Sequence, residues 1–247
     1  MKDRVRTMMT KPKKFTKIYD DLRTQIVNEK LEYGAQLPSE HDLVTMYHAS
    51  RETVRRALNL LVSEGMIQKI RGKGSIVIYQ GVKEFPFSKL TSFKEVQQNL
   101  GIALETEVKL LETVRAQEVP AVQEALDLTN NAVLWHLVRY RKMDGRVKII
   151  DEDYLVEAVV PGLTETIVKN SLYEYIEQQL KQEISYSSKA ITFEAFGEAE
   201  YEAFGQVNPP YTATVRGVVH LKDTTKFQYN IAKHIATEFR FVDFSRR

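Results

Sequence analysis

The spacing of apolar residues changes twice within the first 80 positions of the chain. Apolar residues recur at helical spacing in three short stretches between residues 15 and 62, which predicts three helices. Gly34 and Pro38 separate the first stretch from the second, and His48-Ala49 is the short turn before the third. Over residues 67–78 apolar and polar positions alternate, which is typical of a strand pair. Three helices followed by a hairpin form a winged helix-turn-helix, a module that places its recognition helix in the major groove of DNA.

Two of the predicted helices have favourable residues at their starts. Ser39, with Asp42 three residues later, forms a capping-box pattern, and Ser50 can cap the third helix. His48 turns the chain between these helices, and histidine tolerates left-handed backbone better than most residues. The apolar positions expected to face a common core are Ile18, Tyr19, Leu22, Ile26, Leu43, Met46, Tyr47, Val54, Leu58 and Leu61.

The polar residues at the start of the third helix are expected on its outer side, because its apolar stripe faces the core. Arg51 and Arg55 can each make paired hydrogen bonds to guanine, and N-terminal residues of a recognition helix reach base edges. Ser50 and Thr53 can donate to phosphate oxygens, which positions the helix without reading sequence. Glu52 either accepts from a cytosine amine or orients a neighbouring arginine.

The predicted hairpin has a basic, glycine-rich tip, Arg71-Gly72-Lys73-Gly74. Glycine allows the backbone to approach the sugar-phosphate wall, and basic side chains favour the negative potential of a narrow minor groove. Alone, such a tip is more often an ordinary solvated turn. Its position directly after a helix-turn-helix favours contact with DNA.

The rest of the chain alternates between strand and helix patterns. Asp144-Gly145 lies between two alternating runs and predicts a tight hairpin turn. Strands separated by a few helices indicate an α+β domain with an antiparallel sheet. Strands are expected over 108–114, 133–143, 147–155, 184–193, 212–221 and 227–234, and helices over 92–100, 118–128, 172–180 and 199–204.

Length and charge divide the chain in the same way. At 247 residues the chain suits one large domain or two ordinary ones, and it has no apolar run of about 18 residues that would span a membrane. We expect a flexible basic arm over residues 1–14, the winged helix-turn-helix over 15–80, a linker over 81–88 and a second domain over 89–247. Residues 1–80 carry 15 Lys and Arg against 9 Asp and Glu, a balance of +6, whereas the remainder carries 20 against 24, a balance of −4. Either the charges cluster by chance, or only the first domain meets a polyanion.

The chemistry of the remaining residues argues against an enzyme. The chain has no cysteine and its five histidines lack metal-ligand spacing, so no metal or other cofactor is expected. The acidic run Asp151-Glu152-Asp153 could hold a divalent cation, but such a strand end is more often solvated or binds ligand hydroxyls. The absence of cysteine and of a secretory pattern at the N-terminus fits a reducing cytoplasm.

Arg139 and Arg141 lie two positions apart on a predicted strand, so both project from one face of the sheet. Two guanidinium groups on one face suit a phosphate or a carboxylate, although paired surface charges on an exposed face produce the same pattern. Thr91-Ser92 and Ser171 begin two of the predicted helices, where free backbone amides favour an anion and where capping alone also explains serine.

The first 80 residues resemble the GntR family of bacterial transcription regulators. The resemblance covers roughly residues 15–78 and depends on three motifs in order: Leu37-Pro38-Ser39-Glu40, Ser50-Arg51-x-Thr53-Val54-Arg55-x-Ala57-Leu58 and Gly72-x-Gly74-Ser75. It implies a homodimer that binds a palindromic operator in double-stranded DNA. The DNA contacts implied are Ser39, His41, Ser50, Arg51, Glu52, Thr53, Arg55, Arg71, Gly72, Lys73 and Gly74.

Residues 84–245 resemble the effector domain of the HutC-type branch of that family, whose fold is like chorismate lyase but without the lyase activity. The segments that carry this resemblance are Leu90-Thr91-Ser92-Phe93, Arg139-x-Arg141, Asp153-Tyr154-Leu155, Ser171-Leu172-Tyr173 and Phe227-Gln228-Tyr229. The resemblance implies a sugar-phosphate effector. Its implied contacts are Thr91, Ser92, Phe93, Arg139, Arg141, Glu152, Asp153, Ser171, Tyr173 and Tyr229.

Within this branch, further segments resemble the repressors of trehalose operons, which implies trehalose 6-phosphate as the effector. They include Thr91-Ser92-Phe93-Lys94-Glu95, Tyr173-Glu174-Tyr175-Ile176-Glu177 and Phe239-Arg240-Phe241-Val242-Asp243-Phe244. Two alternatives stay open. The same architecture can sense an amino sugar phosphate or an amino acid, because two arginines do not separate a phosphate from a carboxylate. The second domain could also be a lyase-type enzyme attached to a DNA-binding head.

Overall fold

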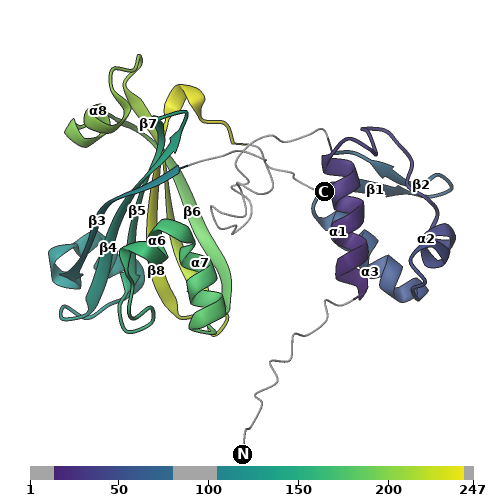
Figure 1. The fold of residues 1–247 in the computed structure, drawn as a ribbon, viewed down its shortest axis with the longest axis horizontal. Helices are drawn as coiled ribbons and strands as arrows, with labels where there is room; N and C mark the ends of the chain where they lie inside the picture. Colours follow the sequence, from purple (N-terminus) through teal and green to yellow (C-terminus); the bar gives the residue numbers. More distant parts are fainter. Residues whose placement is uncertain (1–13, 80–104, 242–247) are drawn as a thin grey trace, which may run out of the picture. The chain divides into compact units, whose positions relative to one another are not determined.

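A computed structural model describes residues 14–79 and 105–241 of the chain (Figure 1). The two stretches belong to two compact units, and each unit has its own hydrophobic core. We call residues 14–79 the head and residues 105–241 the sheet unit. No helix in the described ranges is long and apolar enough to cross a membrane.

The head contains three helices and a two-stranded hairpin, in the predicted order. Ser39 and Ser50 cap the second and third helices as expected, each accepting a hydrogen bond from the backbone amide three residues later. His48 adopts the left-handed conformation, with φ of 45°. The elements are α1 (Lys14–Val27), α2 (Glu40–Met46), α3 (Arg51–Ser63), β1 (Ile67–Ile70) and β2 (Gly74–Val77).

The core of the head is largely the predicted one, with one correction in α2. Leu43 is fully buried, and Tyr47 packs against the core, but Met46 is 58% exposed. Successive helical residues are about 100° apart, so Leu43, Tyr47 and Val44 lie on one side of α2 and face the core. Met46 lies beyond the edge of that side and is turned toward solvent. A two-turn helix has a narrow contact stripe, and the sequence pattern assigned one residue too many to it.

The sheet unit is built around one six-stranded antiparallel sheet, in the order β3-β4-β5-β8-β7-β6. The α+β class predicted from the sequence is therefore confirmed. The turn at Asp144-Gly145 has positive φ at both residues, as a tight hairpin requires. The strands are β3 (Glu105–Arg115), β4 (Val133–Met143), β5 (Arg146–Val156), β6 (Ile184–Ala195), β7 (Tyr211–Leu221) and β8 (Lys226–Ile235).

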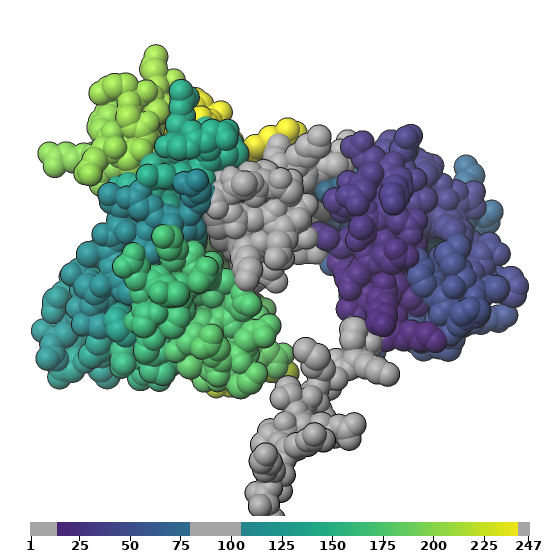
Figure 2. All heavy atoms as spheres, viewed as in Figure 1, coloured from purple at the N-terminus to yellow at the C-terminus, as the bar shows by residue number. Residues whose placement is uncertain are grey.

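Two short helices cover one face of this sheet (Figure 1). These helices bury Val168 and Leu172, and the π-helical turn that follows them buries Ile176, against apolar residues of β4, β5 and β8, Phe227 among them. The green atoms of this layer lie beside the teal atoms of the sheet in the space-filling view (Figure 2), and α6 contacts β3. The remaining helical elements are α5 (Pro120–Leu126), α6 (Glu165–Asn170), α7 (Leu172–Glu174), a π-helical turn (Tyr175–Gln179), α8 (Glu198–Phe204) and 3-10 turns at Ala116–Glu118 and Ala236–Glu238.

Helix α6 was missed by sequence reasoning, because it has six residues and one buried apolar position, Val168, and therefore no periodicity. The helix predicted over residues 172–180 occurs as α7 and the following π-helical turn. The helix predicted over 92–100 lies outside the described residues.

Phe227 supplies the first test of this fold, because its side chain is fully buried between the sheet and the helices. Phe227→Ala is expected to lower the free energy of unfolding of the sheet unit by about 3–5 kcal/mol, through lost burial and the cavity left behind. Phe193→Ala is the matched control on β6, where the side chain is 65% exposed, and its effect should stay within about 0.5 kcal/mol. Urea unfolding followed by circular dichroism measures both. Equal losses would contradict this description of the core.

Candidate functional site

The exposed surface of the head gathers polar residues from α2, the start of α3 and the hairpin. Arg51, Glu52 and Arg55 are all exposed, as predicted from the buried stripe of α3. Arg55 is oriented by an acidic residue, but by Glu40 rather than Glu52: its Nε donates to Glu40 Oε2 at 2.8 Å. Sequence reasoning missed Glu40, since the two residues are 15 positions apart.

The serines of this surface are engaged in capping. Ser50 Oγ accepts from the amide of Thr53 at 3.2 Å and lies 2.8 Å from the Thr53 hydroxyl. Ser39 Oγ donates to Asp42 Oδ2 at 2.7 Å, while the neighbouring His41 is exposed. Each hydroxyl therefore has a structural role in the free chain, and contact with a phosphate would have to be made besides it.

The hairpin tip is exposed at all four of its residues, Arg71, Gly72, Lys73 and Gly74. Both glycines have positive φ, 82° and 84°, which side chains rarely adopt. The backbone carbonyl of Lys73 accepts from Gln36 Nε2 at 2.7 Å, which ties the tip to the segment before α2. The Lys73 side chain is left pointing into solvent beside a backbone held in place.

In the sheet unit, Arg139 and Arg141 share one face of β4, as predicted, but both are buried. They are only 6% and 2% exposed, so they are not a pair of surface charges. Arg139 Nη2 donates to Asp153 Oδ2 at 2.5 Å, and its Nη1 donates to the carbonyl of Val168 at 3.2 Å. The first contact crosses to β5 and the second reaches α6, so Arg139 links the sheet to the helix layer.

Arg141, two residues further along β4, makes a second buried ion pair, with Asp151. Its Nε donates to Asp151 Oδ2 at 2.8 Å and its Nη1 to Thr106 Oγ1 at 2.7 Å. Burial and the nearby Arg139 lower the pKa of Arg141 to about 10, which still leaves it protonated at neutral pH. Burial raises the pKa of Asp151, but the two arginines outweigh burial and hold that pKa below its usual range.

Asp153 is the centre of this group and has no exposed surface. Its Oδ1 accepts from Gln228 Nε2 at 2.7 Å and from Asn230 Nδ2 at 2.8 Å, while Oδ2 accepts from Arg139. Tyr173 extends the network by donating its hydroxyl to Gln228 Oε1 at 3.1 Å. We call Arg139, Arg141, Asp151, Asp153, Gln228 and Asn230 the arginine cluster.

Two of the predicted effector contacts, Arg139 and Ser171, each have a donor that is not used within the described residues. Arg139 Nε is fully buried and has no hydrogen-bond partner there. The Ser171 hydroxyl accepts from the amide of Glu174 at 3.3 Å as the cap of α7, and no acceptor for its proton occurs in the described ranges. A buried donor without a partner costs free energy, and an anion oxygen could satisfy it.

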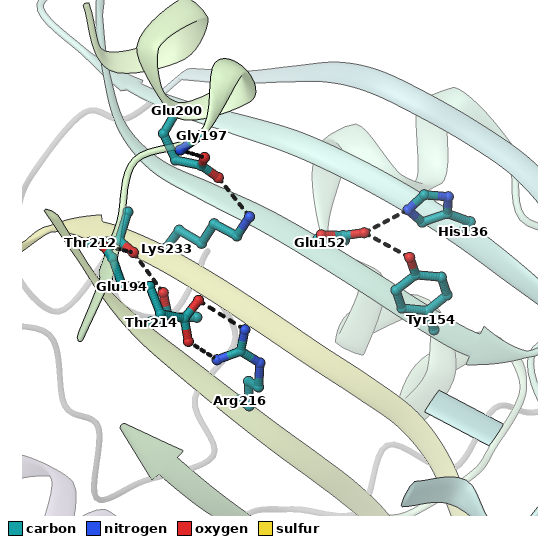
Figure 3. A network of polar contacts seen from close by, with 10 residues as sticks. All are labelled: His136, Glu152, Tyr154, Glu194, Gly197, Glu200, Thr212, Thr214, Arg216 and Lys233. Carbon is teal, nitrogen blue, oxygen red and sulfur yellow. Dashed lines mark hydrogen bonds and ion pairs between the residues drawn. The ribbon is translucent and has the colours of Figure 1, made fainter. Parts of the chain in front are cut away.

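Glu152 and Tyr229, also predicted to contact the effector, lie on the opposite face of the sheet. Alternation along β5 separates Glu152 from its neighbour Asp153, and Tyr229 pairs with Tyr154 across β8 and β5. Glu152 Oε1 accepts from the Tyr154 hydroxyl at 2.7 Å and faces His136 Nε2 at 2.9 Å (Figure 3). The structure therefore does not bring these two residues together with the arginine cluster.

The rest of that opposite face carries separate ion pairs. Arg216 pairs with Glu194, and Lys233 pairs with Glu200 at 2.7 Å (Figure 3). Thr91, Ser92 and Phe93 lie outside the described residues. Across the described ranges no group of three or more His, Asp or Glu side chains could hold a metal ion.

Sequence reasoning missed Asp151, Gln228 and Asn230 as members of the cluster. One signal could have found Asp151. Asp151 and Asp153 are two residues apart on the strand that follows the Asp144-Gly145 turn, so the hairpin places them on the face of the arginines. Gln228 and Asn230 had no local signal, because they are 75 and 77 positions from Asp153.

Comparisons with known proteins match both units. Residues 14–77 match the family "Bacterial regulatory proteins, gntR family", and residues 99–240 match the family "UTRA domain". The HTH-type transcriptional regulator TreR of Bacillus subtilis is 42% identical over 237 residues, which cover 96% of this chain and 99% of that protein. The repressor MngR of Escherichia coli, of the mannosyl-D-glycerate transport/metabolism system, is 32% identical over 72% of each chain.

Two solved structures resemble the fold. The possible transcriptional regulator YydK of Bacillus subtilis superposes with a TM-score of 0.80 over 94% of this chain and 99% of that one; at 22% identity it supports the fold alone. The effector-binding domain of the Bacillus subtilis trehalose repressor TreR superposes with a TM-score of 0.52 at 37% identity, over 58% of this chain and 98% of that one.

The two faces of the sheet carry histidines with opposite pKa shifts. Burial lowers the pKa of His234 to about 4, only partly offset by Asp151. The hydrogen bond with Glu152 raises the pKa of His136 above 6.5. Unfolded His234 takes up a proton below about pH 6.5, whereas the folded chain resists until about 4. The stabilisation from neutral His234 is therefore complete above 6.5 and is lost as pH falls through this window.

We expect the free energy of unfolding of the sheet unit to fall by on the order of 3 kcal/mol between pH 6.5 and 4 because of His234. His234→Gln should remove this part of the acid loss, which urea unfolding at a series of pH values measures. Titration of the histidine rings by NMR is the independent check, with His136 titrating above 6.5. A His234 ring that titrates near 6.5 would refute the assignment.

Proposed function

The chain belongs to the gntR family of bacterial regulatory proteins and carries a UTRA domain, and from this premise we propose that it represses a sugar-utilisation operon, in particular a trehalose operon. It is a DNA-binding regulator rather than an enzyme, as are the relatives that it matches. The observation that carries the proposal is the 42% identity to TreR, because it spans the head and the sheet unit together. Repression takes place in the cytoplasm, where the operator lies.

The head supplies the contacts to the operator. Arg51 and Arg55 read bases in the major groove from the exposed start of α3, and the tip residues Arg71 and Lys73 enter the minor groove. Two heads of a homodimer read the two halves of a palindromic operator, since the symmetry of the protein is matched by that of the site. His41 and the capping residues Ser39, Ser50 and Thr53 contact the phosphate backbone.

The effector is a sugar phosphate, trehalose 6-phosphate, and its phosphate binds at the arginine cluster. Arg139 Nε and the Ser171 hydroxyl are donors without acceptors in the described ranges, which is what an anion oxygen requires. The cluster holds two guanidinium groups and two carboxylates, so its formal charge is zero, and it attracts a phosphate through aimed donors rather than through net charge.

Asp153 acts in this site by holding Arg139, because its carboxylate already accepts from three donors. Tyr173 orients Gln228 in the same way. We also propose Thr91, Ser92 and Phe93 as effector contacts, as the resemblance to the HutC-type branch implies. Glu152 and Tyr229 face away from it and are not part of this phosphate site.

Release from the operator requires the effector to prefer one arrangement of the dimer. A ligand with equal affinity for both arrangements shifts nothing, and a shift from 99:1 to 1:99 needs a preference of about 10⁴-fold. We infer that trehalose 6-phosphate binds the arrangement whose heads do not fit the operator. The alternative effector is another phosphosugar, such as an amino sugar phosphate.

Trehalose 6-phosphate is expected to displace the full chain from an operator duplex, because only the phosphate can engage the arginine cluster. Trehalose should need at least an about tenfold higher concentration, equivalent to about 1.4 kcal/mol of lost binding. Fluorescence anisotropy of a duplex selected by the wild-type chain from a random library measures the displacement. An amino sugar phosphate is titrated in parallel. Displacement by that compound alone would replace trehalose 6-phosphate as the effector.

Arg139→Lys tests the site itself, since lysine keeps the positive charge but loses the fork. This variant should still bind the operator but respond to trehalose 6-phosphate only at about tenfold higher concentration or more. The double variant Arg139→Gln with Asp153→Asn removes both charges of the buried ion pair. It therefore loses the arginine without leaving a buried Asp153 carboxylate unpaired. Wild-type response in both variants would place the phosphate elsewhere.

Two residues of the head test the DNA interface. Arg51→Ala should cost about 1–3 kcal/mol of operator binding and relax the preference for one base position. Lys73→Ala should weaken binding to all duplexes alike and reduce the slope of log affinity against log salt by about 1. Lys222→Ala, an exposed lysine of the sheet unit, is the control and should change neither quantity. If Lys73→Ala altered sequence preference instead, the wing would read bases directly.

A further inference from the structure

Glu40 joins three elements of the head at the surface that faces DNA. It lies in the first turn of α2, its Oε2 accepts from Arg55 Nε of α3 at 2.8 Å, and its Oε1 lies 3.5 Å from Lys69 Nζ of β1. The same Lys69 ammonium donates to Asn59 Oδ1 at 3.1 Å. One carboxylate therefore holds a base-reading arginine and a lysine of the wing at the same time.

The contact leaves the reading end of Arg55 available. Glu40 uses the Nε, and neither terminal amino group of Arg55 has a hydrogen-bond partner in the described ranges. Guanine presents O6 and N7 to the major groove, and the two terminal amino groups of a guanidinium match that pair end-on. A side chain 57% exposed would otherwise sample many rotamers, most of which reach phosphates instead of a base.

We propose that Glu40 is a positioning residue that sets sequence discrimination: it fixes the fork of Arg55 toward a base and keeps Lys69 from neutralising a phosphate. The inference rests on the proposed DNA-binding function of the head. In this proposal Glu40 also lowers the affinity of the head for DNA in general. A carboxylate beside the polyanion opposes binding to every duplex, and a lysine that is held by Glu40 releases no counterion from DNA.

Other acidic groups near Arg55 do not fill this role. Glu52 acts on Arg55 only through its charge, with no hydrogen bond to it, and its position on α3 directs it outward. The hydrogen bond from Arg55 keeps the pKa of Glu40 below its usual value, so Glu40 is a carboxylate over the whole neutral range. Arg56, the adjacent arginine, lies instead over the ring of Phe15, 4.1 Å from its centroid.

The test is Glu40→Gln in the full chain, with a duplex selected by the wild-type chain and a duplex of random sequence. Affinity for the random duplex should rise several-fold, and its salt slope should steepen by about 1 as Lys69 becomes free to contact a phosphate. Affinity for the selected duplex should rise less than affinity for the random duplex, because the contact of Arg55 with its base is weakened. The ratio of the selected to the random affinity should therefore fall by about tenfold, which is the size expected for the loss of one base contact.

Glu29→Gln is the matched control, since it makes the same charge change at an exposed glutamate after α1 that takes part in no ion pair in the described ranges. It should leave the affinity ratio as in the wild type. A second cycle uses Arg55→Lys, after which Glu40→Gln should no longer alter discrimination. Thermal unfolding of each variant separates these effects from a loss of stability of the head.

An unchanged ratio in Glu40→Gln, or a ratio that falls equally with and without Arg55→Lys, would overturn the positioning role. That result differs from failure of the proposed function itself. If the wild-type chain selects no duplex from the library and binds all duplexes alike, DNA reading by the head is wrong, and the role of Glu40 falls with it.

Discussion

The buried ion pair between Arg139 and Asp153 is the interaction on which the sheet unit depends. A charge without exposed surface is tolerated only when it is paired and its remaining hydrogen-bonding capacity is satisfied. Asp153 meets this condition by accepting from donors on β4 and β8. Arg139 meets it in part, because it also donates to the carbonyl of Val168 in α6, while its buried Nε has no partner in the described ranges. The pair therefore ties three strands and the helix layer to one point, and a ligand that binds Arg139 acts on all of them.

The two faces of the sheet carry separate polar groups, and only one of them contains the proposed effector site. Side chains alternate between faces, so β4 and β5 contribute to the arginine cluster on one face and to the Glu152–His136–Tyr154 group on the other. The second group is drawn in Figure 3. The shifted pKa values of the two histidines reflect the same division. Burial lowers the pKa of His234, whereas the hydrogen bond with Glu152 raises the pKa of His136.

The head follows a different physical principle, since its chemistry lies on the surface. Burial of Val54, Leu58 and Leu61 leaves the polar side of α3 outward, and the caps at Ser39 and Ser50 hold the ends of the helices that present it. Arg55 is exposed on this polar side, and in our proposal Glu40 fixes its orientation. In the proposed repressor, the sheet unit decides when the head binds and Glu40 decides how selectively.

Local patterns in the sequence by themselves determined most elements, because caps, turns and periodicity act over a few residues. They were sufficient for the winged head, for the left-handed His48, for the hairpin that turns at Asp144-Gly145 and for the shared face of Arg139 and Arg141. They failed where a short element has too few buried positions, as in α6, or where the contact stripe is narrow, as at Met46.

Only the tertiary structure decided which residues meet. The pairing of β5 with β8 brings Gln228 and Asn230 to Asp153, and the folding of α2 against α3 brings Glu40 to Arg55. Burial of both arginines depends on the face of the sheet that α6 and α7 cover. Such contacts join positions far apart in the chain, and no local pattern carries information about them.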